Sequence, residues 1–127
     1  MGIIAKMRRQ DAIYWPPGTA DNYGRRDYGS LVELVLDGGD NYRVRWEDRV
    51  EEYIDKEGTT RQSLAVVYVP QLPDGSEVEI GGFLWLGVRG DLVSESNPRL
   101  NPSACEVHRV DHLPKLKNTE VLRTAYL

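Results

Sequence analysis

Residues 42–58, YRVRWEDRVEEYIDKEG, fit two kinds of regular structure, and the choice between them determines the fold class. Four apolar residues have the helical spacing i, i+4, i+7 and i+8, namely Trp46, Val50, Tyr53 and Ile54. Apolar residues also recur at even positions, as along one face of a strand, at Tyr42, Val44, Trp46, Val50 and Ile54. The odd positions between them carry both signs of charge, at Arg43, Arg45, Glu47, Arg49 and Glu51.

The segment that follows favours the strand interpretation. Residues 63–69, SLAVVYV, read as a strand that is apolar on both faces, and they follow across a turn that contains Gly58. A helix over residues 42–55 would leave this strand without a sequence neighbour to pair with. We therefore predict an antiparallel hairpin of residues 42–55 and 60–69, turning at residues 56–58. An unbroken strand of ~13 residues would be about 40 Å long and would project past a small domain.

The rest of the chain has the same character. Turn clusters such as DGGDN, LPDGS and SNPRLNPS separate short runs rich in Val, Ile, Tyr and Trp, and these clusters leave little room for long helices. We predict an all-β fold: a small antiparallel β-barrel or sandwich with a long projecting hairpin and a long N-terminal loop. The residues that we expect in its core are Trp46, Leu64, Val66, Tyr68, Leu84 and Leu86.

Size and composition narrow the possible functions. The chain has 127 residues, so we predict one domain over residues 1–127. Its 20 acidic and 16 basic residues give a net charge of −4, which argues against a polyanion-binding protein. Cys105 is the only cysteine and cannot form an intrachain disulfide. No apolar run approaches the ~20 residues of a membrane span, so we expect no membrane partner.

One stretch of the sequence contains residue types that could form a metal site. The stretch CEVHRVDH contains Cys105, His108, Asp111 and His112, which are residue types that bind zinc. On a strand, however, Cys105 and His108 point to opposite faces, so a tetrahedral set is not expected. The serines have no recognisable base and orienting group, and the glycines do not form a phosphate-binding loop. We expect no catalytic residue, no metal and no cofactor.

Two segments resemble assembly elements. The loop of residues 16–29 is long, lacks apolar periodicity and contains Tyr and Arg, which are enriched at interface hot spots. The C-terminal segment, residues 118–127, ends on the apolar Ala-Tyr-Leu and is expected to be an extended strand docked on a sheet edge of its own or of a neighbour. The alternative is a short helix, for which Asn118 would be the cap and Glu120 would lie near the N-terminus. The interface residues that we predict are Tyr23, Arg25, Arg26, Tyr28, Arg45, Arg49, Tyr126 and Leu127.

Five segments, taken in order, resemble the small head–tail connector proteins of tailed bacteriophages, a group that includes head-closure (stopper) and head–tail joining proteins. The run VRWED followed by an S-x-A-x-V-Y-V strand carries most of this resemblance. The polar stretch around residues 97–103 is shorter than many such proteins have. The five segments are AIYWPP with a YG-rich loop, VRWED with ID and G, SLAVVYV, GGFLWLG and LPKLKNTEVLRTAYL.

The resemblance implies a structural protein of the virion neck. Such proteins assemble in the host cytoplasm into rings, here a hexamer or dodecamer, between the portal or adaptor proteins and the tail-terminator or tail proteins. Packaged DNA passes through the ring and makes transient, non-specific contacts. No catalytic residues are carried over.

The alternative is a stand-alone module similar to SH3 or Tudor domains. Such a module would bind a peptide in an aromatic groove built from Trp15, Tyr23 and Tyr28.

Overall fold

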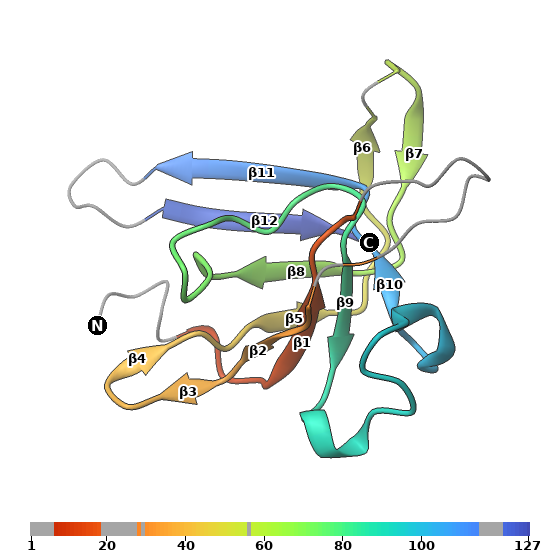
Figure 1. Cartoon of the computed structure of the whole chain (residues 1–127). Coiled ribbons are helices and arrows are strands. Elements are labelled where there is room, and N and C mark those ends of the chain that lie inside the picture. Colours follow the sequence, from red (N-terminus) through yellow and green to blue (C-terminus); the bar gives the residue numbers. More distant parts are fainter. Residues whose placement is uncertain (1–6, 19–27, 29, 56, 115–120) are drawn as a thin grey trace.

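The computed structural model describes residues 7–18, 28, 30–55, 57–114 and 121–127, and it is all-β with short 3₁₀ turns. Two antiparallel four-stranded sheets form the body of the molecule (Figure 1). The first sheet has the order β10 (Cys105–Glu106), β9 (Phe83–Leu86), β1 (Ala12–Trp15) and β2 (Val32–Leu34). The second has the order β11 (Arg109–Pro114), β12 (Val121–Tyr126), β8 (Val66–Val69) and β5 (Arg45–Glu47).

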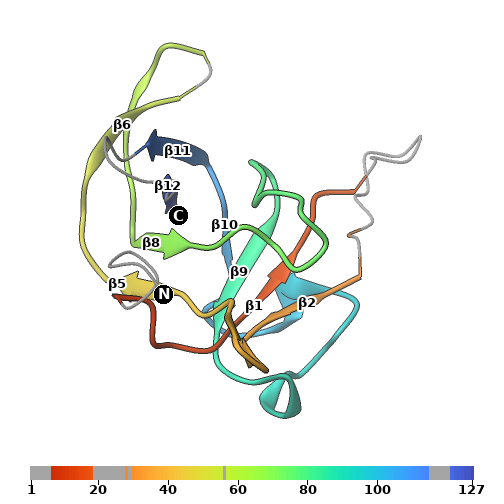
Figure 2. The same cartoon turned by 90° about the vertical axis from the view of Figure 1, so that its left-hand side faces the viewer.

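Two hairpins extend from these sheets. The first connects β3 (Leu36–Asp37) to β4 (Asp40–Asn41), and the second connects β6 (Glu52–Ile54) to β7 (Thr60–Gln62). The β6–β7 hairpin points away from the body in both views (Figures 1 and 2). The 3₁₀ turns η1 (Arg89–Asp91) and η2 (Pro98–Leu100) lie between β9 and β10.

The two sheets are linked at both sides of the sandwich. On one side, Gln10 and Val44 exchange two backbone hydrogen bonds of 3.0 and 2.8 Å, just before β1 and β5. On the other side, the chain passes from β10 in the first sheet directly into β11 in the second. At this crossing the Val107 N–H donates to the Gly82 carbonyl at 2.8 Å. The two sheets are therefore joined by local backbone contacts at both sides, without forming one closed sheet.

The core lies between the sheets. All four residues of β1 are buried, because both faces of this strand are covered. Ala12 and Tyr14 belong to the main core, while Ile13 and Trp15 pack with Phe83 in a second cluster. Other fully buried members of the main core are Leu34, Val44, Val67, Leu84, Val107 and Ala125.

The predicted long hairpin is confirmed in outline. Strands β5 and β6 pair antiparallel with β8 and β7, and no helix forms over residues 47–53. The strand is not continuous, however. Four residues, 48–51, separate β5 from β6, whereas three residues, 63–65, separate β7 from β8. One extra residue in the first strand is a bulge, and it shifts the side-chain alternation by one position.

This shift corrects the predicted apolar face. Trp46 packs against the core from an even position, but beyond the bulge the buried residue is the odd-numbered Tyr53. Val50 and Ile54, expected on the same face as Trp46, are 66% and 56% exposed. The even-position pattern therefore holds only as far as Trp46.

The predicted core is correct in part. Val66 and Leu84 are fully buried, and Trp46 and Tyr68 are half-buried. Leu64 was expected in the core but is 76% exposed. The reason is a second irregularity: the Leu127 carbonyl accepts from the Leu64 N–H at 2.7 Å, while the Leu127 N–H donates to the Ala65 carbonyl at 3.0 Å. Leu64 and Ala65 thus lie opposite the single residue Leu127, which is a β-bulge, and this bulge turns the Leu64 side chain outward.

Leu86 is the other wrong core prediction. It is the last residue of β9, and its side chain is 40% exposed. Strand alternation places it on the same face as Leu84, but the strand ends there.

Candidate functional site

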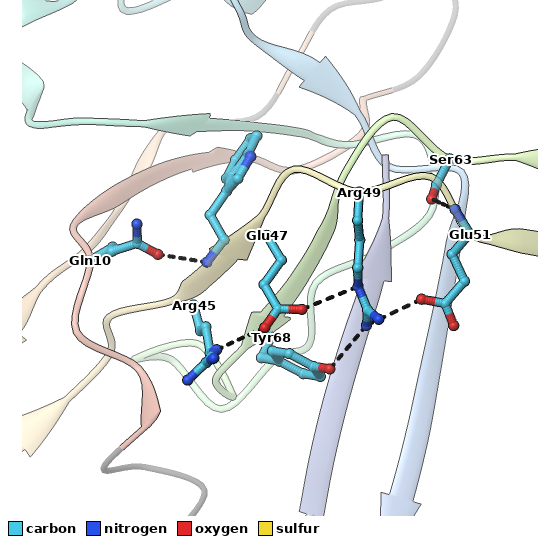
Figure 3. A network of polar contacts seen from close by, with 8 residues as sticks. Gln10, Arg45, Glu47, Arg49, Glu51, Ser63 and Tyr68 are labelled. Carbon is cyan, nitrogen blue, oxygen red and sulfur yellow. Dashed lines mark hydrogen bonds and ion pairs between the residues drawn. The ribbon is translucent and has the colours of Figure 1, made fainter.

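A row of alternating charges follows the interrupted strand from β5 toward β6. We call it the charge ladder, and Figure 3 shows its members, Arg45, Glu47, Arg49 and Glu51. Glu47 forms ion pairs with both arginines. Arg45 Nε lies 2.9 Å from one of its carboxylate oxygens, and Arg49 Nε lies 3.1 Å from the other. Arg49 also contacts Glu51 Oε2 at 3.1 Å and donates to the Tyr68 hydroxyl at 3.2 Å. Arg49 thus links the ladder to strand β8.

The ladder is a surface feature. The two arginine side chains are 46–47% exposed, and the two glutamates are 28% and 39% exposed. Exposed ion pairs of this kind contribute about 0–1 kcal/mol each to stability. The two positive and two negative charges cancel, so this face offers paired polar groups to a partner without a strong field of either sign. The structure therefore brings the predicted contact residues Arg45 and Arg49 together.

A groove lies at the base of the β6–β7 hairpin, and we call it the hairpin groove. Its volume is about 750 Å³. One wall is the hairpin itself, and the other is formed by the turn before β9 and by the chain between β10 and β11. The residues that line it are Tyr53, Asp55, Glu57, Thr60, Arg61, Gln62, Leu64, Ile80, Gly81, Glu106, Val107, His108 and Leu127.

The turn of the hairpin is fixed by Asp55. Its Oδ1 accepts from the Glu57 and Thr59 N–H groups at 3.0 and 2.9 Å, and its Oδ2 pairs with Arg61. The Arg61 guanidinium, followed by the Thr59 N–H, holds the pKa of the Asp55 carboxyl below its usual range. These bonds satisfy backbone N–H groups of the turn locally.

The groove combines apolar and acidic groups. Leu64 and Ile80 are 76% and 49% exposed at its lining. Glu106 lies on the opposite wall, 3.6 Å from His108 Nδ1. The lining also contains Glu57 and the Asp55–Arg61 pair. These observations define a surface that presents aliphatic contact next to negative charge. Sequence reasoning missed this groove because it forms from segments far apart in the chain.

Tyr28 was predicted as a contact residue and is held by its own chain. Its ring packs edge-on against Phe83, with centroids 5.3 Å apart and planes at 89°. Its hydroxyl accepts from Arg99 Nε at 2.9 Å, and the Arg99 guanidinium lies 5.4 Å from the centroid of the Phe83 ring. This cluster anchors one end of the predicted interface loop. The other loop residues proposed for contact, Tyr23, Arg25 and Arg26, lie outside the described residues.

The prediction of an extended C-terminal segment paired with a sheet is confirmed for residues 121–127, but its expected edge position is wrong; residues 118–120 lie outside the described residues. Strand β12 lies between β11 and β8 in the chain's own second sheet, so it is a central strand rather than an edge addition. Leu127 is buried at 3% exposure, and Tyr126 is half-buried with its ring 5.7 Å from that of Tyr53. Burial raises the pKa of the Tyr126 hydroxyl. Of the two, Tyr126 is the residue with surface left for a partner.

The potential zinc ligands do not converge. Cys105 Sγ lies 3.4 Å from the Ser103 carbonyl, and burial raises the pKa of its thiol. His108 faces Glu106, whereas His112 lies 3.8 Å from Glu77. Within the described part of the chain, no three His, Cys, Asp or Glu side chains group in a way that could hold a metal ion.

Comparisons with models of protein families, with curated proteins and with solved structures find no match to this chain. In the segments that the structure describes, no helix has the length and apolar character needed to cross a membrane. The function must therefore be inferred from the geometry of the hairpin, the groove and the ladder, and from the resemblance of the sequence to head–tail connector proteins.

Proposed function

We propose that this protein is a structural subunit of the neck of a tailed bacteriophage, where it forms a ring between the portal or adaptor complex and the tail. The observation that carries the proposal is the β6–β7 hairpin, which leaves a small sandwich and exposes the outer edge of β7, an edge that a monomer normally protects. A second polypeptide that covers this hairpin would remove that liability.

Other features support the same proposal. The charge ladder offers a polar face of paired opposite charges next to the hairpin, which suits packing between identical neighbours. The net charge of −4 limits adhesion of DNA phosphates as DNA passes through a ring. The ordered segments around VRWED and SLAVVYV supply the resemblance to connector proteins.

The alternative of an SH3- or Tudor-like module has less support. Its proposed aromatic groove needs Trp15 at the surface, but Trp15 is fully buried. The Trp15 indole N–H also donates to the Glu95 carbonyl at 2.8 Å, which ties the ring to the interior. Tyr28 packs on Phe83, against the same buried cluster that contains Trp15.

A depletion experiment tests the proposed function. A phage that cannot make this chain should accumulate DNA-filled or emptied heads and free tails, seen by electron microscopy, and supplying the chain in trans should restore joined particles. Normal joined particles in its absence would refute the proposal.

A further inference from the structure

The outer edge of the long strand formed by β7 and β8 is paired along only part of its length. Strand β12 pairs with β8 along that edge, from Val69 to Val66. The last bond on it runs from the Leu64 N–H to the Leu127 carbonyl, at 2.7 Å. Beyond this bond, β7 pairs only with β6 among the described residues. The paired edge thus continues as an open edge at β7.

The backbone geometry shows which groups face outward there. In the hairpin, the Asp55 N–H donates to the Thr59 carbonyl, and the Ser63 N–H donates to the Glu51 carbonyl. Odd-numbered residues of this strand therefore bond inward to β6. In an antiparallel pair the alternate residues point their N–H and C=O groups away. Thr60 and Gln62 consequently present two donors and two acceptors at the outer edge.

This open edge faces the hairpin groove. Thr60, Gln62 and Leu127 all line the groove, so a strand placed in it would continue the line of β12. It would run antiparallel to β7, as β12 runs antiparallel to β8. Added strands bind in this way through main-chain hydrogen bonds, while alternate side chains give specificity.

The walls of the groove indicate the chemistry of the incoming strand. Leu64 and Ile80 offer exposed aliphatic contact. Asp55, Glu57 and Glu106 supply three carboxylates against the single guanidinium of Arg61, so these four groups carry a net charge of −2. A strand with aliphatic and basic side chains complements this lining.

We infer that the hairpin groove binds an extended segment of another protein, rich in aliphatic and basic residues, which adds to β7 as a strand. The inference rests on the proposed function only in taking the partner to be another protein of the assembly. The groove provides the main-chain register, the aliphatic contact and the charge that select this segment.

The test is peptide binding to the full chain. The probe is a fluorescent, end-blocked peptide of alternating lysine and valine, about seven residues long, with a glutamate–valine peptide of the same length as its control. We expect the lysine peptide to bind at least about tenfold more tightly, and to shift the amide NMR signals of Thr60 and Gln62. Equal binding of both peptides, no binding of either, or unshifted Thr60 and Gln62 signals would overturn the inference.

Two pairs of variants sharpen this test. Gln62→Pro removes one outward N–H but no bond to β6, and it should weaken binding at least about tenfold, whereas Gln62→Thr should bind normally. If Gln62→Pro fails to fold, the exposed-charge variant Glu57→Lys with Glu106→Lys should reverse the preference between the two peptides. Unchanged binding in Gln62→Pro, or an unchanged preference in the charge variant, would contradict strand addition here.

The occupant and the proposed function are tested separately. A dimer of this chain that sedimentation detects and Gln62→Pro abolishes would assign the groove to a second copy and overturn the choice of partner. Peptide binding by a chain that the depletion experiment shows to be unnecessary for joining would refute the neck proposal alone. Loss of joining on depletion, without peptide binding, would refute this inference alone.

Discussion

At the scale of single residues, packing is tight around Gly82, where the first sheet meets the turn before β9. A Cβ atom at Gly82 would lie 2.7 Å from the Trp15 carbonyl oxygen and 2.7 Å from Tyr14 Cε1. Both neighbours are fully buried and cannot move without disturbing the core. The absence of a side chain at Gly82 is therefore required by packing.

Gly82→Ala is expected to destabilise the protein by about 1–3 kcal/mol, because the added methyl group overpacks a fixed site. The matched control is Gly39→Ala in the β3–β4 turn, where a Cβ atom would meet nothing within 4 Å. That change should stay within about 0.5 kcal/mol of wild type. Urea unfolding of both variants makes the comparison, and equal midpoints would contradict the packing described at Gly82.

Tyr14 gives a prediction about pH. Its buried hydroxyl accepts from the Glu79 N–H at 2.8 Å, and burial raises the pKa of Tyr14 to about 12 from 10.0. Because the folded state holds this proton more tightly, the contribution is fully present below pH 10 and is lost as pH rises toward 12. Tyr14→Phe should flatten this part of the stability–pH curve and cost about 1–3 kcal/mol at neutral pH. Tyr42→Phe is the control, and an equal alkaline slope in wild type and Tyr14→Phe would contradict this assignment.

At the scale of elements, the sequence predicted the strand class of residues 42–55 and their antiparallel pairing, because Val, Ile, Tyr and Trp alternate with charges there. It did not predict the two bulges, which depend on contacts with distant segments. The pairing of Leu64 and Ala65 with Leu127 joins residues more than 60 positions apart, so no local pattern signals it. The same reason explains why the hairpin groove was missed while the charges of the ladder were anticipated.

Strand β12 should be essential for folding. Deleting residues 124–127 removes the residues of β12 from Thr124 to Tyr126, which pair with both β8 and β11. It also removes the buried side chains of Ala125 and Leu127. Loss of two buried apolar side chains and of half of a central strand is comparable with the stability margin of about 5–15 kcal/mol that domains usually have. We expect circular dichroism to show no cooperative melting transition. A truncated chain that melts at the wild-type temperature would show that β12 does not hold the second sheet together.

The charge ladder should matter for assembly more than for stability. Arg49→Glu places a third carboxylate between Glu47 and Glu51, but at 46% side-chain exposure the cost in folding free energy should be under about 1 kcal/mol. If the ladder lies at an interface, the added carboxylate repels acidic groups there and weakens assembly. We therefore expect Arg49→Glu to lower the yield of joined particles by about tenfold or more. The assay is restoration of joined particles in phage depleted of the chain.

A control at another site makes this result specific. Arg89→Glu alters an arginine that is 53% exposed and pairs with Glu33 and Glu95, away from the ladder. It should restore joined particles normally. Equal yields for Arg49→Glu and wild type would show that the ladder is a solvated face.

At the scale of the whole molecule, the fold is a small sandwich from which the β6–β7 hairpin points outward (Figures 1 and 2). The hairpin groove lies at the base of this hairpin, and the charge ladder lies on the surface of the strand that leads to it (Figure 3). Its C-terminal strand is internal, so β12 stabilises the chain's own fold. A buried core with one exposed strand edge is the arrangement that the proposed neck subunit would need.

The most direct measurement of the proposed role is the position of the chain in a finished particle. Virions labelled with a gold-conjugated antibody against this chain should carry label at the junction of head and tail, seen by electron microscopy. A disrupted-neck preparation should show the label on ring-shaped particles. Label on the capsid shell or along the tail only, or none on virions that the same antibody detects after denaturation, would contradict a place in the neck.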